Sequence, residues 1–425
     1  MGACARNTVS LMAALLLTAG LTQSALGFGV FTHEAIIEIS WQQTLEPLLV
    51  KRFPTATPEQ LRVARTYAYG GAIIQDLGYF PRSNEFYSDL LHYVRSGDFI
   101  QELFRQAADL YEYAFALGAL EHYAADTTGH PLATNPAVAI YNPQLRAKYG
   151  DAVTYEQSKV AHAQAELGFD VVDMAGKVYR REIFSELIAF AVPTALLERA
   201  FKHTYGLELK ALFSEHKLDR TIGVYQRVLS DLYPRLTQVA WTLKRREILA
   251  LHPQLAEKDF EYPRSMPKEA RAAAGRHYEE PKLVDKGLTV LMRVPFKLGL
   301  LKSLDFDVPT PATEKLFVKS IEVMRELYRR LLGDIDTGRL VLPNRNFDTG
   351  RPSRPGEYAL ADHTYAELLD TLAKVHFKGM TPDLKAHLLA YYAASEKPLA
   401  TKKEKRERQT VLRDLEQLQA TDPVG

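Results

Sequence analysis

Helical periodicity is the feature of this 425-residue sequence that most constrains its fold. Apolar residues recur at intervals of three and four along most of the chain, as they do on one face of an amphipathic helix. Residues 59–69 and 313–332 are examples, and a longer segment runs from residue 99 to about residue 126. No convincing alternation of apolar and polar residues predicts a strand. The sequence therefore predicts an all-α, multi-helix protein.

The first residues have the composition of a secretory signal peptide. Arg6 is followed by an apolar run over residues 9–21 and then by small residues that include Ala25 and Gly27. The apolar run is shorter than the roughly 20 residues that span a bilayer. This order predicts cleavage after Gly27, with Phe28 as the mature N-terminus, and export to the periplasm or the extracellular space. An uncleaved membrane anchor is the alternative.

Cysteine content and charge exclude several kinds of protein. The single cysteine, Cys4, lies in the expected signal peptide, so the mature chain has neither a disulfide framework nor a thiolate metal ligand. Loss of Arg6 with that peptide leaves 52 basic and 52 acidic residues. A neutral chain is not drawn to nucleic acid or to an anionic membrane by its bulk charge. No later stretch is apolar for long enough to cross a membrane.

The chain divides into two helical regions by composition. We expect one domain over residues 28–251, a linker or exposed connection over residues 252–282, and a C-terminal helical region of unassigned role over residues 283–425. Within the last region, residues 344–351 form a polar run. The simplest interpretation of this run is an ordinary surface turn. The alternative is a loop that reaches over the active site and binds a substrate group.

Two histidine–acid pairs indicate metal binding. His122 precedes Asp126 by four residues, and His162 precedes Glu166 by the same interval. Residues four apart share one face of a helix, so each pair can direct an imidazole and a carboxylate at one point. This combination of ligands suits zinc at a catalytic site. A single pair is more often a surface hydrogen bond, but two pairs on alanine-rich helices favour a metal.

His130 and Asp76 extend this set. His130 lies between Gly129 and Pro131, where the helix is expected to end, so its side chain can turn back toward Asp126. Asp76 lies in an apolar stretch, where an unpaired carboxylate is costly. Either a metal ion or a buried arginine would satisfy it.

The order of these residues resembles the zinc-dependent phospholipase C family, which shares its all-α fold and metal cluster with the S1/P1 nucleases. The matching series, in chain order, is His33, Asp76, His92, His122, Asp126, His130, His162 and Glu166. Residues 117–126 look like the central helix of that family. The resemblance covers residues 28–166 and is weaker beyond them.

The resemblance implies a cluster of two to three zinc ions. The first ion would be held by Asp76, His92, His122 and Asp126. The second would be held by His130, His162 and Glu166. The third would be held by His33, by Asp126 as a bridge, and by the amino nitrogen and carbonyl of the mature N-terminal residue, Phe28. The resemblance also implies that Asp76 is the catalytic base that orients the attacking water.

The chain departs from the family pattern at three places. Phe28 replaces the usual N-terminal tryptophan, and His130 follows Asp126 by four residues where the family usually has six. Leu77 and Asp89 stand where choline-specific members have aromatic residues. The aromatic residues available to bind a substrate head group through cation–π contacts are Tyr79, Phe80, Phe86 and Tyr87.

The expected function is hydrolysis of phosphodiester bonds by a zinc-activated water, with a phospholipid as the favoured substrate. Glu166 as the last acid and the lack of mature cysteines favour a phospholipase C over a nuclease. An S1/P1-like nuclease stays open as an alternative, although the sequence has no aromatic and basic stripe. The other alternative is a non-catalytic or degenerate family member that binds metal and acts as a binding module.

Overall fold

The computed structural model describes residues 29–80, 83–176, 190–213, 218–255, 306–394 and 402–422. Within these residues every regular element is helical, apart from one isolated β-bridge between Arg345 and Pro352. The all-α prediction is therefore confirmed. None of the described helices combines the length and the apolar character that a membrane span needs.

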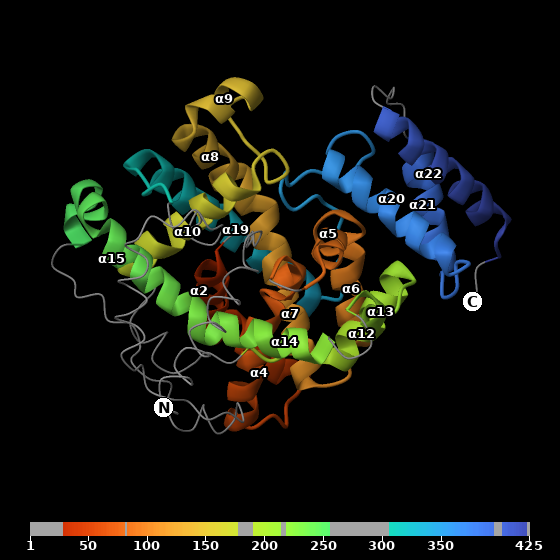
Figure 1. Cartoon of the computed structure of the whole chain (residues 1–425). Coiled ribbons are helices and arrows are strands. Elements are labelled where there is room, and N and C mark those ends of the chain that lie inside the picture. Colours follow the sequence, from red (N-terminus) through yellow and green to blue (C-terminus); the bar gives the residue numbers. More distant parts are fainter. Residues whose placement is uncertain are drawn as a thin grey trace, which may run out of the picture.

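Figure 1 shows the arrangement of the described helices. The N-terminal half contains α2 (Val30–Ser40), η1 (Trp41–Leu45), α3 (Glu46–Arg52), α4 (Pro58–Gly71), η2 (Ile74–Tyr79), α5 (Glu85–Tyr93), α6 (Ser96–Gln106), α7 (Leu110–Gly129), η3 (His130–Thr134), α8 (Asn135–Tyr141), α9 (Pro143–Tyr149) and α10 (Lys159–Gly176). The remainder contains α12 (Thr194–Tyr205), α13 (Leu209–Leu212), α14 (Leu218–Arg227), η4 (Val228–Leu232), α15 (Tyr233–Leu251), η5 (Pro253–Leu255), α19 (Pro311–Asp336), α20 (Ala359–Lys374), α21 (Pro382–Ala393) and α22 (Lys402–Ala420). Elements η1, η3 and η4 are π-helical turns, and η2 and η5 are 3-10 turns.

Helix α7 lies in the middle of the molecule (Figure 1). Nearly all of its residues are buried, and helices α4, α19, α6 and α2 pack against it. A helix that is buried on every side must carry small or apolar residues all round, and α7 is rich in alanine and glycine. The polar side chains of Glu121, His122 and Asp126 on this helix therefore lie in the protein interior.

Two glycines allow α4 and α7 to cross with their backbones in contact. A Cβ atom placed on Gly118 of α7 would lie 1.9 Å from the carbonyl oxygen of Ala68 on α4. A Cβ atom on Gly71 of α4 would lie 2.0 Å from the carbonyl oxygen of Phe115 on α7. Because both contacts are to backbone atoms, no side-chain movement can relieve them. The small-residue face of α7 is thus matched to one partner helix.

The start of α7 corrects one prediction from the sequence. A single helix from residue 99 to about residue 126 is wrong, because α6 ends at Gln106 and α7 begins at Leu110. Asp109 has an extended backbone, and its carboxylate accepts hydrogen bonds from the backbone N–H groups of Tyr111 and Glu112, both at 2.9 Å. An aspartate that satisfies these donors favours a helix start over a helix interior.

The C-terminal region packs directly onto the first half of the chain. The hydroxyl of Tyr328 on α19 donates to the carbonyl of Leu117 on α7 at 2.9 Å, and α20 packs on α5. One apolar core runs through both regions, from Val30 to Leu418. The expected connection after residue 255, and residues 283–305 of the expected C-terminal region, lie outside the described residues.

The crossing of α4 and α7 predicts that Gly118→Ala destabilises the protein. Overpacking of this kind costs about 1–3 kcal/mol, and the higher helix propensity of alanine recovers at most about 1 kcal/mol of it. We expect a net loss of about 1–2 kcal/mol in the free energy of unfolding, measured by urea denaturation. The matched control is Gly333→Ala on the exposed side of α19, where an added Cβ meets nothing within 4 Å. This control should be neutral or slightly stabilising, and equal losses in both variants would contradict the close crossing.

Candidate metal centre

Helix α7 contributes the central acid of a buried polar cluster. His122 and Asp126 lie one turn apart on α7, and both side chains are fully buried. The Nε2 atom of His122 lies 3.1 Å from Oδ2 of Asp126. The pair therefore shares one face of the helix, as its spacing predicts. That face is covered by other polar residues.

A first group of ligand-type side chains gathers around Oδ2 of Asp126. Asp76 comes from η2 and His92 from the end of α5. His92 Nε2 lies 3.3 Å from Asp76 Oδ1 and 3.6 Å from Asp126 Oδ2. Burial opposes protonation of His92, but Asp126 and Asp76 together raise its pKa to about 10. These neighbouring carboxylates thus make the centre of the cluster strongly attractive to positive charge.

Backbone carbonyls determine which way the two rings of this group face. His92 Nδ1 lies 2.8 Å from the carbonyl oxygen of Ser88, and His122 Nδ1 lies 2.9 Å from that of Ala72. A carbonyl only accepts, so each ring carries a proton on Nδ1 and directs its Nε2 atom into the cluster. The two Nε2 atoms lie 3.4 Å apart. Both Nε2 atoms would be available to a metal ion that takes the place of any proton between them and the carboxylates.

A second group forms on the opposite oxygen of Asp126. His33 of α2 stacks on His122 with 4.5 Å between the ring centroids, and its Nε2 atom lies 3.5 Å from Asp126 Oδ1. Its Nδ1 atom donates to the carboxylate of Glu121 at 3.1 Å. Burial opposes the charge on His33, but Glu121 and Asp126 raise its pKa well above the usual range. Glu121 is a site residue that sequence analysis missed.

A third group lies beyond the end of α7. The chain continues from α7 into the π-helical turn η3, which begins at His130. His130 Nε2 lies 3.7 Å from Asp126 Oδ1 and 3.6 Å from Glu166 Oε1. His162 Nε2 lies 2.7 Å from the same oxygen of Glu166. His130 therefore joins the cluster although it follows Asp126 by only four residues.

Asp348 also belongs to this third group, and sequence analysis did not assign it a role. Its Oδ1 atom lies 3.4 Å from Nδ1 of His130, and the residue is only 1% exposed. The adjacent Phe347 is fully buried, with its ring 5.1 Å from that of His92. The interpretation of residues 344–351 as an ordinary surface turn is therefore wrong. The alternative, a loop that reaches the site, is the arrangement found, and the polar run was its signal.

The donor atoms fit a metal cluster. Neither carboxylate oxygen of Asp76, Asp126 or Glu166 accepts a hydrogen bond, and neither does Oδ1 of Asp348, although all are buried. An unpaired buried carboxylate costs several kcal/mol, so these groups require a cation. Among the residues that the structure describes, three sets of side chains offer ligand atoms within 4.8 Å of one another: His33–His122–Asp126, Asp76–His92–His122 and His130–His162–Asp348. Imidazole and carboxylate without thiolate is a ligand set typical of catalytic zinc.

The expected N-terminal ligand, Phe28, lies outside the described residues, but the residues after it are held beside the cluster. Asp170 accepts the backbone N–H of Phe31 at 3.1 Å and the hydroxyl of Thr32 at 2.9 Å. The hydroxyl of Tyr233 donates to the same carboxylate at 2.7 Å. A side chain at Gly29 would collide with Asp170, because its Cβ would lie 2.3 Å from the carboxyl carbon. Asp170 thus anchors the start of α2 next to His33.

The aromatic residues expected to bind substrate have different positions. The ring of Tyr79 lies 5.3 Å from that of His92, at the edge of the ligand cluster. Phe80 packs edge-on against Tyr225, with centroids 4.6 Å apart, and Phe86 is a member of the apolar core. Among these residues, Tyr79 is the one whose ring contacts a candidate ligand.

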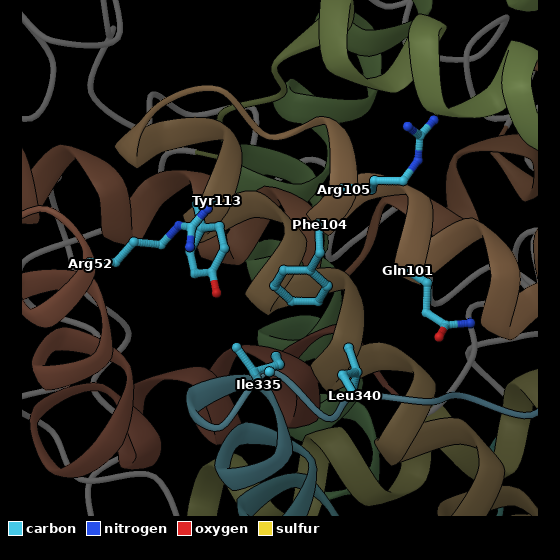
Figure 2. A pocket seen from close by; sticks show the side chains of 8 residues that line it. Arg52, Gln101, Phe104, Arg105, Tyr113, Ile335 and Leu340 are labelled. Atoms are coloured by element: carbon cyan, nitrogen blue, oxygen red, sulfur yellow. The ribbon is translucent and has the colours of Figure 1, made fainter.

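An open groove of about 350 Å³ lies elsewhere, between α3, α6, α7 and the end of α19. Figure 2 shows the aromatic rings of Phe104 and Tyr113 in its wall, with Arg52 beside Tyr113. The guanidinium carbon of Arg52 lies 4.4 Å from the centroid of the Tyr113 ring. No imidazole or carboxylate lines this groove. The buried cluster, and not this groove, is therefore the candidate metal centre.

Asp89 is a buried acidic residue beside Tyr79. The Tyr79 hydroxyl donates to Asp89 Oδ1 at 3.0 Å. Burial, assisted by Glu85 and opposed by Lys159, raises the pKa of Asp89 to about 7. In the unfolded chain the pKa of an aspartate is about 3.9, so the folded state holds a proton that the unfolded state releases. The stability that this proton provides is present below about pH 4 and is lost as the pH rises toward about 7.

We therefore expect Asp89→Asn to stabilise the protein more at pH 8 than at pH 5. Asparagine keeps an acceptor for Tyr79 and carries no charge, so the gain at pH 8 can reach about 4 kcal/mol and should shrink as the pH falls. Urea denaturation at both pH values measures it. Asp151→Asn is the control, because its carboxylate is 84% exposed and its ion pair with Arg146 lies at the surface. A pH-independent gain in the Asp89 variant would contradict the raised pKa.

The family model described as "Zinc dependent phospholipase C" matches residues 32–215. No curated protein and no solved structure matches the chain significantly. The matched segment contains each candidate ligand from His33 to Glu166 and ends before Asp348. The helical elements of the matched segment and its buried imidazole and carboxylate groups agree with the match to this zinc-dependent family. Over residues 32–215 this chain is therefore similar to the zinc-dependent phospholipase C family.

Proposed function

We propose that this protein is a phospholipase C, which hydrolyses the phosphodiester bond between diacylglycerol and the head group of a phospholipid. One observation carries the proposal. Imidazoles and carboxylates from α2, η2, α5, α7, η3 and α10 converge on Asp126 with carboxylate oxygens that accept no hydrogen bond. The match of residues 32–215 to the family model of zinc-dependent phospholipase C supports zinc as the ion and a phospholipid as the substrate.

Two to three zinc ions would occupy this cluster. Asp76, His92, His122 and Asp126 would hold the first, and His130, His162 and Glu166 the second. His33, Asp126 and the N-terminal residue Phe28 would hold the third. Bound zinc would supply hydroxide at neutral pH and neutralise charge on the phosphate oxygens.

The protein's own groups would orient the reactants and move the proton. Hydrogen bonds from Nδ1 of His92 and His122 to backbone carbonyls keep both rings in one orientation. The carboxylate of Asp76, which accepts no hydrogen bond from the protein, would take the proton of the attacking water. The water oxygen would bond to phosphorus as the bond from phosphorus to the glycerol oxygen breaks. The glycerol oxygen would accept that proton from Asp76, and diacylglycerol would leave.

Two tyrosine rings are suited to contact the substrate. The ring centroids of Tyr79 and Tyr155 lie 5.6 Å apart. The Tyr79 ring lies beside that of His92, and the Tyr155 ring lies beside that of His162. The ammonium of Lys159 lies 5.1 Å from the Tyr155 ring and pairs with Glu85. We propose that the head group of the substrate contacts these residues when it binds. Because Phe80 faces the core rather than the cluster, a choline cage of three aromatic rings is not part of this proposal.

We also propose that export and cleavage after Gly27 complete the site, because Asp170 holds residues 31 and 32 beside His33. Mass spectrometry of the exported protein should then give Phe28 as its first residue. A protein with two extra residues before Phe28 should bind one zinc fewer than the cleaved form, because its amino nitrogen is displaced. Urea denaturation serves as the folding control. Equal zinc content in both forms would contradict the N-terminal ligand.

The central test is the double substitution His122→Ala with Asp126→Ala. These residues contribute to more than one ligand group, so we expect most of the zinc to be lost from protein purified without chelator. Release of phosphorylated head group from phospholipid vesicles should fall by at least about 1,000-fold, as expected when metal-assisted catalysis is removed. Elemental analysis and phosphate assay measure the two effects.

The chain contains a matched control pair. His363 and Glu367 have the same spacing on α20, with 3.9 Å between Nε2 and Oε2, and both are about half exposed. Alanine at both positions should leave zinc content and activity unchanged. Zinc without hydrolysis of any phosphodiester would support a non-catalytic binding module instead, and activity on nucleic acid alone would support a nuclease. Absence of zinc from the wild-type protein would reject the metal centre.

A further inference from the structure

The segment that contains Asp348 is built into the site although it lies far along the chain. The backbone N–H of Phe347 donates to the carbonyl of His92 at 3.1 Å. The side-chain amide of Asn135 donates to the carbonyl of Asp348 at 2.8 Å. Before these contacts, Ser96 exchanges hydrogen bonds with the backbone of Arg345 at 2.6 and 3.0 Å. These contacts attach the segment to α5, α6 and α8, and α5 itself contributes the candidate ligand His92.

A tight local turn determines the position of Asp348 within this segment. The side-chain oxygen of Asn346 accepts the backbone N–H groups of Asp348 at 2.9 Å and Thr349 at 3.1 Å. Gly350 has a φ of +68°, and a Cβ atom there would lie 2.4 Å from the carbonyl oxygen of Thr127 on α7. The left-handed backbone and the close approach both require glycine. The turn therefore fits against the last turn of α7, where Asp126 lies.

The two oxygens of Asp348 have different surroundings. Oδ2 accepts the backbone N–H of Tyr155 at 2.9 Å and the hydroxyl of Tyr358 at 2.7 Å. Oδ1 accepts no hydrogen bond and lies 3.4 Å from Nδ1 of His130. A carboxylate with one oxygen held by protein donors and the other open has the arrangement of an oriented monodentate ligand.

We propose that Asp348 is a metal ligand and holds the second zinc ion together with His130 and His162. Their ligand atoms lie within 4.8 Å of one another. Two donors bonded to one tetrahedral zinc at about 2.0–2.1 Å are about 3.3 Å apart, and Oδ1 of Asp348 lies 3.4 Å from Nδ1 of His130, so this ring would bind the ion that Asp348 holds through Nδ1. This assignment rests on the proposed metal centre and adds a ligand from outside the matched segment, residues 32–215.

Charge supports the same assignment. Two carboxylates flank the ring of His130, with Glu166 Oε1 3.6 Å from Nε2 and Asp348 Oδ1 3.4 Å from Nδ1. Both acids are buried, at 2% and 1% exposed, so each carboxylate is most favourable where a positive charge lies beside it. The C-terminal region would then complete the catalytic cluster, and it would be more than a neighbouring domain.

Asp348→Asn is the decisive variant. One side of the amide keeps an oxygen for Tyr155 and Tyr358, while the other side presents an NH₂ group, which does not bind zinc. We expect the variant to bind one zinc fewer than the wild type, or its last zinc at least 100-fold more weakly. In cobalt-substituted protein, we expect the visible absorption bands to change, because the ligand set changes. Elemental analysis, metal titration and absorption spectroscopy measure these effects without use of activity.

Tyr358→Phe is the matched control. It removes the hydrogen bond to Oδ2 and leaves Oδ1 in place, so zinc number and cobalt spectrum should match the wild type. Unchanged zinc number and spectrum in Asp348→Asn would overturn the assignment, as would equal zinc loss in both variants. Weaker binding with an unchanged cobalt spectrum would also overturn it and make Asp348 a positioning residue for His130. A wild-type protein without zinc would reject the whole metal centre, which distinguishes that failure from the failure of Asp348 alone.

Discussion

The structure depends on more carboxylate charge in its interior than its own hydrogen-bond donors satisfy. Asp170 and Asp126 illustrate the difference, since both are fully buried. Asp170 accepts hydrogen bonds from Phe31, Thr32 and Tyr233 and acts as a structural anchor. Asp126 accepts none, yet imidazole nitrogens face both of its oxygens. Only a positive charge beside Asp126 can offset the free energy that its burial costs. The stability of the fold therefore depends on the same carboxylates that would bind the metal.

Helix packing and ligand orientation are linked through backbone atoms. The glycine contacts between α4 and α7 bring the end of α4 close to α7. The carbonyl of Ala72, directly after α4, then reaches Nδ1 of His122 and directs its Nε2 atom inward. The carbonyl of Ser88 does the same for His92 within α5. A ring held in this way cannot turn without breaking its hydrogen bond to the carbonyl, which keeps the cluster organised.

Local patterns predicted much of the fold and of the cluster. Periodicity is a local property, so the all-helical class and helices such as α4 and α19 followed from the sequence. The pairs His122–Asp126 and His162–Glu166 were found for the same reason, because one helical turn fixes their spacing. The break before α7 was missed because the capping preference of Asp109 competes with an apolar pattern that continues across it.

The sequence by itself determined the helical class, the order of the ligand-type residues and their resemblance to a known family. Tertiary structure alone decided that Glu121 pairs with His33, that Asp170 anchors the start of α2, and that Asp348 reaches His130. Asp348 is separated from His130 by more than 200 residues of chain, and no periodic pattern relates positions so far apart. Their meeting depends on how α19 packs against α7 and on the turn at Gly350, which are properties of the assembled core.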